Sequence, residues 1–403
     1  MPGKPLKIAI SIWSFTPGTG GLQAHTENLC KNLMMRGHEV TVITRSATRI
    51  PKGADYLFFN EPEDHIRVNQ VHVRPLRLSH SWAPVLWATL KFAARPRLAS
   101  LAAQLYETAA ARPARSAFAG FDLIHHVGHA TALAGFAAAH AAAGNRIPFL
   151  VQPTAHPLNF GDSDLDFRLY HRADRLLVHT QYEREYFSNK RIRCPIDVVY
   201  NGIEDRSDGV GDRFRQKHGI KGPMILYIGR KAIDKGYPLA VTAFERVYAQ
   251  NPSVMMVCMG PASLDAERKA HPGILDLDYA TEEEKHDALA ACNFLCVPSE
   301  GESFGLVYME AGRYRKAVIG RNLPVLKELL GEGAAVLLGR PVPKANKAEL
   351  PPEELAAEMT KLVDQPAYCQ KIGDACHEVS NSYLWPTVVK NFENVYYKAL
   401  KVS

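Results

Sequence analysis

The sequence predicts two successive α/β domains, each a doubly wound parallel sheet, that face each other across a cleft. In both halves of the chain, short apolar runs alternate with amphipathic stretches, and polar or glycine-bearing loops separate them. Residues 204–222 are polar and carry glycines, and we interpret them as a linker with a short helix. A chain of 403 residues is long enough to bury two sizeable cores.

The composition is that of an ordinary globular protein, with 46% hydrophobic and 22% charged residues. The seven cysteines lack the C-x-x-C spacing of zinc or redox motifs, and most lie in apolar surroundings, so we expect buried free thiols. We find neither a signal segment at the start nor an apolar run of about eighteen residues. These features favour a cytoplasmic location.

The positive charge is concentrated in the first half. Residues 1–200 carry 23 basic and 15 acidic side chains, whereas residues 201–403 carry 25 and 27. The alanine-rich stretch 81–118 adds tryptophans to several arginines, and such a segment can lie on an anionic membrane or bind an anionic partner. A helical hairpin packed on its own domain is the alternative. We expect no nucleic-acid partner, because no recognised binding motif accompanies the charge.

The first half opens with a βαβ pattern. An apolar strand, 7–13, leads through the glycine-rich loop 16–21 into an amphipathic helix and a second strand, 39–44. The loop lies where such folds bind phosphate, although a plain tight turn is the alternative. The dinucleotide fingerprint is broken, because Gln23 stands at the third glycine and Arg45 follows the second strand in place of an acid. This disfavours an NADP oxidoreductase.

The remaining elements follow the same alternation. In the first half we predict, in order, a short strand at 68–73, helix at 81–118, a strand and turn at 122–129, a helix to 143, and strands at 149–152, 173–180 and 197–200. In the second half we predict strands at 224–228, 254–259, 274–278 and 293–297, helices ending near 250 and 292, helix over 351–382, and a terminal amphipathic helix over 385–400.

The stretch 298–311 is the most informative part of the sequence. It follows a buried strand and leads into a helical pattern, with Glu302 and Glu310 eight positions apart. If the helix begins near Phe304, its first N–H groups, from Gly305 to Val307, form an anion site. Two hydroxyl-binding carboxylates beside an anion suit a nucleotide-sugar.

A structural alternative exists for the same residues. Ser299 and Glu302 have the spacing of a capping box, and Glu310 would then be a solvated helix residue.

Two cations follow the first strand of the second half. Arg230 and Lys235 stand in a loop bounded by Gly229 and Gly236. Fixed cations at the carboxyl end of a parallel strand can stabilise charge on a leaving phosphate. A solvated loop lysine is the alternative for Lys235.

Three stretches resemble the retaining glycosyltransferases of family 4. Pro-Ser-Glu-Gly-Glu-Ser-Phe-Gly-Leu-Val-Tyr-Met-Glu-Ala at 298–311 resembles the E-x7-E motif, Gly-Gly-Leu-Gln-Ala-His at 20–25 resembles the family's opening loop, and Gly-Arg…Lys-Gly at 229–236 resembles its phosphate clamp. The resemblance implies a GT-B fold and α-retaining transfer from a UDP- or GDP-sugar to a hydroxyl acceptor, such as a glycan, a lipid-linked glycan or a small molecule. No metal or other cofactor is implied, because neither Asp164-x-Asp166 nor Asp276-x-Asp278 lies where the phosphates should.

The resemblance also assigns roles to residues. Histidine in the family's Asp-x-x-His-x-His strand touches the donor sugar, but the ungapped position here is Val127. We prefer His129, for which a structural histidine is the alternative, and keep His126 and His156 as further candidates. The residues implied around the reaction are Glu302, Arg230, Lys235 and His129, and those implied around the donor are Gly20, Gly21, Ser303, Phe304, Gly305, Leu306, Val307 and Glu310.

The resemblance divides the chain into parts. We expect an acceptor-side domain at 1–203, the linker at 204–222, a donor-binding domain at 223–383, and a final helix at 384–403 that crosses back to the first domain. Peripheral contact with the inner face of a membrane would involve 81–115. A nucleotide-sugar 2-epimerase of the same fold and an inactive membrane-associated nucleotide-sugar-binding subunit remain alternatives. The sugar, the base of its nucleotide and the acceptor remain open.

Overall fold

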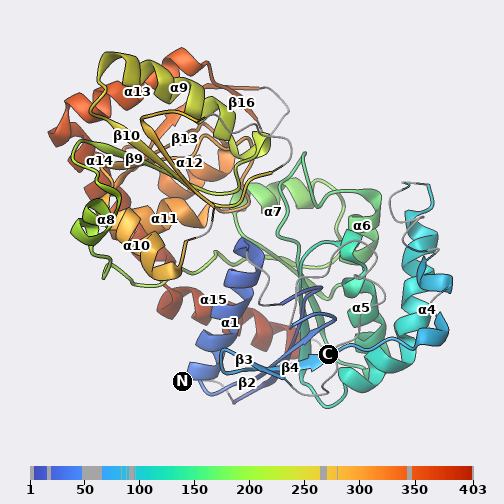
Figure 1. Ribbon diagram of the computed structural model, residues 1–403. Helices are drawn as coiled ribbons and strands as arrows, with labels where there is room; N and C mark the ends of the chain where they lie inside the picture. The colour runs from blue at the N-terminus through green and yellow to red at the C-terminus, as the bar shows by residue number, and fades with distance from the viewer. Residues whose placement is uncertain are drawn as a thin grey trace. The chain divides into compact units, whose positions relative to one another are not determined.

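A computed structural model of the protein describes residues 4–15, 20–47, 66–82, 84–87, 89, 95, 97–263, 270–278, 280–342 and 347–401. The chain divides into two compact units, and each is an α/β structure around a parallel sheet (Figure 1). The first unit comprises residues 1–202 with 385–403, and the second comprises 203–384. The prediction of two parallel-sheet α/β domains is therefore confirmed.

Within the described residues, the sheet of the first unit has eight strands in the order β3-β4-β2-β1-β5-β6-β7-β8. Every pairing is parallel except β3 with β4. The chain leaves β1 in one direction along the sheet and returns to β5 on its other side, so the strand order reverses between them. The strands are β1 Lys7–Ser11, β2 Glu39–Thr44, β3 Ile66–Val68, β4 Val71–Pro75, β5 Leu123–Val127, β6 Phe149–Gln152, β7 Arg175–Val178 and β8 Ile196–Val198.

One predicted strand of this unit is wrong. The stretch 68–73 is interrupted by a turn, because Asn69 and Gln70 adopt left-handed backbone conformations with φ of 46° and 72°. The chain reverses there, and β3 pairs antiparallel with β4 at the edge of the sheet. The apolar alternation of 66–75 therefore belongs to a hairpin.

The helices of the first unit are α1 Gly21–Met35, α4 Ala99–Ala117, α5 Ala134–Asn145, α6 Asp164–Tyr170, α7 Gln181–Ser188 and α15 Trp385–Leu400, with short 3-10 turns η1 His80–Trp82 and η2 Ala130–Ala132. Side chains fix the starts of two of them. Ser163 and Asp166 form a capping box at α6, and Thr180 accepts a hydrogen bond from the backbone of Glu183 at α7.

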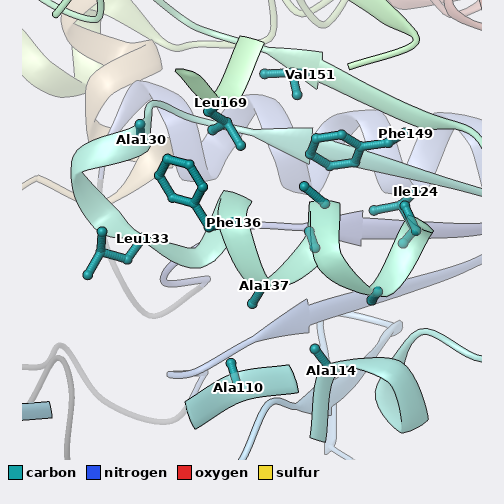
Figure 2. Packing of buried hydrophobic residues seen from close by; sticks show 14 of the residues in the cluster. Ala110, Ala114, Ile124, Ala130, Leu133, Phe136, Ala137, Phe149, Val151 and Leu169 are labelled. Atoms are coloured by element: carbon teal, nitrogen blue, oxygen red, sulfur yellow. The ribbon is translucent and has the colours of Figure 1, made fainter. Parts of the chain in front are cut away.

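Alanines let α4 pack against α5 over the sheet. Ala110 and Ala114 of α4 face Ala137 of α5, and Phe136 fills the space toward α6 (Figure 2). Small side chains allow two helices to approach closely while still excluding water from the strands below. The helix predicted over 81–118 is not continuous, because α4 begins only at Ala99, after a turn at 97–98. The buried face of α4 packs on its own domain, as the packed alternative expects.

The sheet of the second unit has six parallel strands, counted over its described residues, in the order β11-β10-β9-β12-β13-β14. This order also reverses once, between β9 and β12. In sheets of this kind ligands bind at the carboxyl ends of the strands beside such a reversal. The strands are β9 Met224–Ile228, β10 Met255–Met259, β11 Ile274–Leu277, β12 Phe294–Cys296, β13 Ala317–Arg321 and β14 Val336–Leu338, with a separate ribbon of β15 Arg340–Pro341 and β16 Ala348–Glu349.

The helices of the second unit are α8 Gly211–His218, α9 Tyr237–Gln250, α10 Glu282–Ala291, α11 Leu306–Arg313, α12 Pro324–Leu330, α13 Pro352–Asp364 and α14 Pro366–Ser380, with η3 Ile233–Lys235 and η4 Asn381–Tyr383. The helical prediction for 351–382 missed a break after Asp364. Pro366 begins a new helix there, because proline suits a first helical position and cannot continue the preceding one.

The final helix, α15, packs in the first unit beside α1 (Figure 1). Its Tyr396 hydroxyl lies 2.8 Å from Nδ1 of His125 in β5. Its Glu393 accepts from Arg36 at 2.6 Å and lies 2.9 Å from Nε2 of His38. Polar contacts to buried rings therefore fix a helix whose apolar face already covers the sheet.

Several histidines of this unit are buried. His25 stacks on Trp385, and its ring lies edge-on to that of His179. The Nε2 atom of His25 lies 3.3 Å from Oε1 of Gln152. Removal from water lowers the pKa of His25 to about 4. It lowers the pKa values of His126 and His179 to about 3.

We expect these histidines to make the fold sensitive to mild acid. Each folded-state pKa lies below the unfolded value, so the neutral rings stabilise the protein fully above pH about 6.5 and progressively less as the pH falls toward 4. The free energy of unfolding should drop by on the order of 2 kcal/mol for each such histidine between pH 7 and 5, measured by urea titration.

A matched pair of variants separates the contribution of the buried histidines from acid denaturation caused by other groups. His25→Gln should flatten the pH dependence, whereas His80→Gln, at an exposed position of η1, should leave it unchanged. An unfolding free energy that does not vary between pH 7 and 5 would contradict the assignment.

Candidate active site

The loops after β9 and β12 lie side by side at the strand-order reversal of the second unit. The first, residues 229–236, is called here the clamp loop, and the second, residues 298–305, leads into α11. Gly236 adopts a left-handed conformation with φ of 69°, and a Cβ atom there would collide with the carbonyl oxygen of Pro298. The N–H of Glu300 also donates to the carbonyl of Asp234 at 2.8 Å. A glycine and a backbone hydrogen bond thus hold the two loops together.

This contact joins two residues that the sequence singled out separately. Nζ of Lys235 lies 2.9 Å from Oε1 of Glu302, and their side chains are only 21% and 11% exposed. An ion pair shielded from water in this way is screened less than a surface pair. Lys235 is therefore a fixed cation of the site, which excludes the alternative of a solvated loop lysine.

The other predicted cation faces a different partner. The guanidinium of Arg230 donates to the carboxylate of Asp234 at 2.7 Å, and its side chain is 54% exposed. The hydroxyl of Tyr227 donates to the backbone carbonyls of Arg230 and Lys235, at 2.8 and 3.3 Å, and so ties the two ends of the clamp loop. Asp234 and Tyr227 were not expected from the sequence.

Helix α11 begins at Leu306, two residues later than predicted. Gly305 precedes it in a left-handed conformation with φ of 82°, and the buried ring of Phe304 packs against that of Tyr383. The N–H groups at the start of α11, from Leu306 and Val307, lie at the positive end of the helix. They lie in the chain segment that directly follows Glu302 and Ser303.

The capping-box alternative is not what the structure shows. The hydroxyl of Ser299 donates to the carbonyls of Gly301 and Asp234, at 3.1 and 3.4 Å. The carboxylate of Glu302 accepts from Nζ of Lys235, and Gly305 stands at the cap position of α11 with no side-chain cap hydrogen bond. Neither residue therefore caps α11.

Glu310 lies in the second turn of α11 and has a partner of its own. Its Oε1 accepts from Nζ of Lys285, in α10, at 3.2 Å, and its side chain is 27% exposed. It is therefore not simply a solvated helix residue. Nothing in the spacing of 298–311 pointed to Lys285, because the two residues come from different helices.

A buried lysine completes the clamp loop. Lys231 is fully buried and forms ion pairs with Asp276 and, at 3.6 Å, with Asp278. It also donates to the carbonyl of Leu277 at 3.0 Å. Asp276 and Asp278, the Asp-x-Asp pair that was not expected to hold a metal, thus anchor the clamp loop to the end of β11.

The candidates of the first unit lie around its own strand-order reversal. Gly20 and Gly21 stand at the start of α1, whereas residues 16–19 of the preceding loop lie outside the described residues. His129 follows β5, and its ring lies edge-on to Phe160 with centroids 4.3 Å apart. Burial lowers the pKa of His129, which the nearby carboxylate of Asp166 partly opposes.

The three candidate histidines have different surroundings. His126 is buried within β5, with Nδ1 lying 3.1 Å from the hydroxyl of Ser11. His129 and His156 both approach Phe160, whose side chain is half exposed. The structure therefore groups His129 with His156 at the carboxyl end of the sheet and places His126 inside it.

Three findings concern metals, thiols and membranes. Among the residues that the structure describes, no group of three or more histidine, cysteine, aspartate or glutamate side chains could hold a metal ion. The seven cysteines are free, and all except Cys194 are buried, as expected. No helix of the described segments is long and apolar enough to span a bilayer.

Comparison with known proteins connects this geometry to an enzyme class. The model of Glycosyltransferase Family 4 matches residues 19–206, and the model of Glycosyl transferases group 1 matches residues 211–378. An uncharacterized glycosyltransferase of Methanocaldococcus jannaschii is 21% identical over 98% of this chain and 99% of its own. A glycogen synthase of Mycobacterium tuberculosis strain H37Rv is 24% identical over 98% and 95%.

Solved structures share the fold over nearly the whole chain. Sucrose-phosphate synthase from Thermosynechococcus elongatus superposes with a TM-score of 0.72 at 17% identity, covering 99% of this chain and 100% of that one. The Anabaena protein HepE, solved in complex with UDP and glucose, superposes with a TM-score of 0.68 at 17% identity, covering 98% and 100%.

Proposed function

Since this chain is a glycosyltransferase with the GT-B fold, built from a Glycosyltransferase Family 4 half and a Glycosyl transferases group 1 half, we propose that it transfers a sugar from a nucleotide-diphosphate sugar to a hydroxyl group with retention of configuration. The product carries an α-glycosidic bond. The acceptor is a glycan, a lipid-linked glycan or a small molecule with a free hydroxyl.

The observation that carries this proposal is the pairing of Lys235 with Glu302 beside the start of α11. A diphosphate placed there meets the ammonium group of Lys235 and the first N–H groups of the helix together. An ammonium group has three donors, so Lys235 can serve a phosphate oxygen while it keeps Glu302 in place.

Charge on the leaving diphosphate is stabilised by protein groups in this proposal. Arg230 becomes available to the phosphate when it releases Asp234, and the exchange is cheap because an exposed pair of this kind contributes about 0–1 kcal/mol. Preorganised donors of this type stabilise a developing oxyanion without rearranging during the reaction. The proposed transfer therefore needs no metal.

Retention follows if attack and departure occur on the same face of the sugar. The acceptor oxygen forms a bond to the anomeric carbon as the bond from that carbon to the phosphate oxygen breaks. The leaving phosphate takes the proton of the acceptor hydroxyl. Glu302 lies next to Lys235, where its carboxylate can stabilise positive charge that develops on the sugar.

Thermal denaturation with a panel of UDP- and GDP-sugars tests the proposal. A ligand that binds the folded protein raises its melting temperature by mass action, and the matching nucleotide-sugar should do so. Lys235→Ala should abolish most of the shift. A panel that shifts the melting temperature of neither protein would contradict the proposal. Epimerised nucleotide-sugar recovered without transfer would favour the epimerase, and binding without turnover would favour the inactive subunit.

The basic side chains of the first unit lead to a prediction about membranes. Arg95, Arg97 and Arg112 are exposed, and Trp87 is 53% exposed on the same stretch, whereas Lys91 lies outside the described residues. We propose that this surface meets an anionic membrane or an anionic acceptor. Co-sedimentation with anionic liposomes should then weaken steeply as salt rises, because surface charges are screened.

A charge-matched control makes this measurement specific. Arg95→Ser with Arg97→Ser should reduce co-sedimentation. Arg340→Ser with Arg315→Ser, which removes as much charge from exposed positions of the second unit, should not. Co-sedimentation that is absent, or indifferent to salt, would leave only the packed-hairpin interpretation.

A further inference from the structure

Lys285 joins two helices of the second unit through a partly buried ion-pair network. Its Nζ lies 2.8 Å from Oε2 of Glu282, one turn earlier in α10, and 3.2 Å from Oε1 of Glu310 in α11. The side chain of Lys285 is 19% exposed, that of Glu310 is 27% exposed, and Glu282 lies at the surface. The ammonium group of Lys285 thus bridges the solvated carboxylate of Glu282 and the more shielded carboxylate of Glu310.

We propose that Lys285 is a positioning residue for nucleotide recognition, which orients the carboxylate of Glu310 toward the vicinal hydroxyls of a ribose and so makes the site select ribonucleotides over 2′-deoxyribonucleotides. This inference rests on the proposed function, in which a nucleoside diphosphate lies beside α11. It goes further by naming the residue that orients Glu310, the carboxylate that the family resemblance already places around the donor.

The chemistry of the carboxylate supports this role. An ionised carboxylate has about four lone-pair sites on two oxygens, so the bond from Lys285 to Oε1 leaves capacity to accept from two hydroxyl groups. A diol is recognised well only if that carboxylate is held in one orientation, because a mobile glutamate loses rotamer freedom when it binds. Lys285 removes this freedom before the nucleotide arrives.

The helix backbone around Lys285 is itself held in place. In α10, the carboxylate of Asp287 accepts from Arg213 and from the backbone N–H of Val210 at 2.6 Å. The next residue along from Lys285, His286, lies 2.9 Å from the hydroxyl of Tyr314 at the end of α11. These contacts hold α10 against α8 and α11, so the backbone that carries Lys285 is held in place beside α11.

The positively charged form of Lys285 is also stabilised by its neighbours. Burial disfavours the ammonium form, but the carboxylates of Glu310 and Glu282 outweigh that effect and raise the pKa of Lys285. Lys285 therefore stays protonated at neutral pH. Its positive charge also offsets the repulsion between Glu310 and a diphosphate, and the experiment must separate this from orientation.

Calorimetric titration with paired nucleotides makes the separation. UDP is compared with 2′-deoxy-UDP, and GDP with 2′-deoxy-GDP, for the wild type and for Lys285→Met, Lys285→Gln and Lys285→Arg. The control is Lys217→Met, which removes a lysine that pairs with Glu284 at 2.6 Å near the other face of α10. A loss of charge alone weakens both members of a nucleotide pair equally, whereas a loss of orientation changes their ratio.

The wild type should bind the ribonucleotide roughly tenfold more tightly than its 2′-deoxy counterpart, as expected for a hydrogen bond to a charged acceptor. Lys285→Met and Lys285→Gln should bring that ratio close to one. Lys285→Arg, whose guanidinium can still bridge two carboxylates, and Lys217→Met should keep it.

Each other outcome has a definite meaning. A ratio that stays unchanged in Lys285→Met and Lys285→Gln overturns the inference, as does a wild type that binds both sugars equally. A wild type that binds neither UDP nor GDP overturns the proposed function itself. The two failures are therefore distinguishable. If Lys285→Met does not fold, Lys285→Gln still allows the test. Its side chain is polar and shorter than that of lysine, so it should disturb the contact between α10 and α11 less.

Discussion

Lys235→Ala is expected to lower the turnover of sugar transfer by roughly 10²-fold, because removing one preorganised donor from a developing oxyanion typically costs about 3 kcal/mol. The structure gives the reason for choosing this lysine. Its amine is fixed by Glu302 at 2.9 Å and lies beside the start of α11, so it cannot be replaced by a mobile surface cation. Turnover is measured as nucleoside diphosphate released in the presence of acceptor.

The ion pair between Lys235 and Glu302 allows a second explanation for low turnover in Lys235→Ala, and this explanation must be excluded. Without Lys235, the largely buried carboxylate of Glu302 loses the ammonium group that offsets its charge, which by itself can disturb the site. The double variant Lys235→Met with Glu302→Gln removes that charge. If Lys235 binds the diphosphate, the double variant binds the free nucleoside diphosphate more weakly than Glu302→Gln alone does. Equal nucleoside diphosphate affinity in these two variants, or wild-type turnover in Lys235→Ala, would end the clamp hypothesis.

The two glutamates should differ in what they contribute. Glu310 accepts from hydroxyls that are present before and during the reaction, so Glu310→Gln should weaken both the nucleotide-sugar and the free nucleoside diphosphate by roughly tenfold. Glu302 acts where charge develops on the sugar, so Glu302→Gln should mainly lower the turnover number.

The contact between Glu302 and Lys235 sharpens this expectation. Loss of the carboxylate releases the amine of Lys235 to the diphosphate, so Glu302→Gln should bind the free nucleoside diphosphate at least as tightly as the wild type does. Titration calorimetry of both variants decides the matter. Equal losses of nucleoside diphosphate affinity in the two variants would refute the division of roles.

Much of the fold could be predicted, because each strand or helix has its own pattern of apolar residues within a short stretch of sequence. The runs 149–152 and 224–228 are short, mostly apolar and bounded by proline or glycine, and β6 and β9 have these same bounds. The final helix, α15, also has the predicted bounds 385–400, since its apolar residues recur at helical spacing. The errors came where backbone geometry overrides such patterns, as at Asn69 and at the break before Pro366.

The candidate site was predictable only in part. Two motifs placed Lys235 and Glu302 in different loops, and the parallel sheet brings the two residues together after β9 and β12. Partners from other elements could not be found in this way. Lys285 pairs with Glu310 across 25 positions, and Lys231 with Asp276 across 45, and neither pair has a recognisable spacing. Such contacts depend on how helices and strand ends pack.

The central claim is retaining transfer from a nucleotide-sugar, and time-resolved proton NMR of the reaction tests it most directly. The nucleotide-sugar selected by thermal denaturation is incubated with the enzyme and an acceptor, or with water in slow hydrolysis. We expect the transferred or released sugar to form first as the α-anomer, in step with release of the nucleoside diphosphate. A product that forms first as the β-anomer would contradict the account, as would epimerised nucleotide-sugar with no diphosphate released.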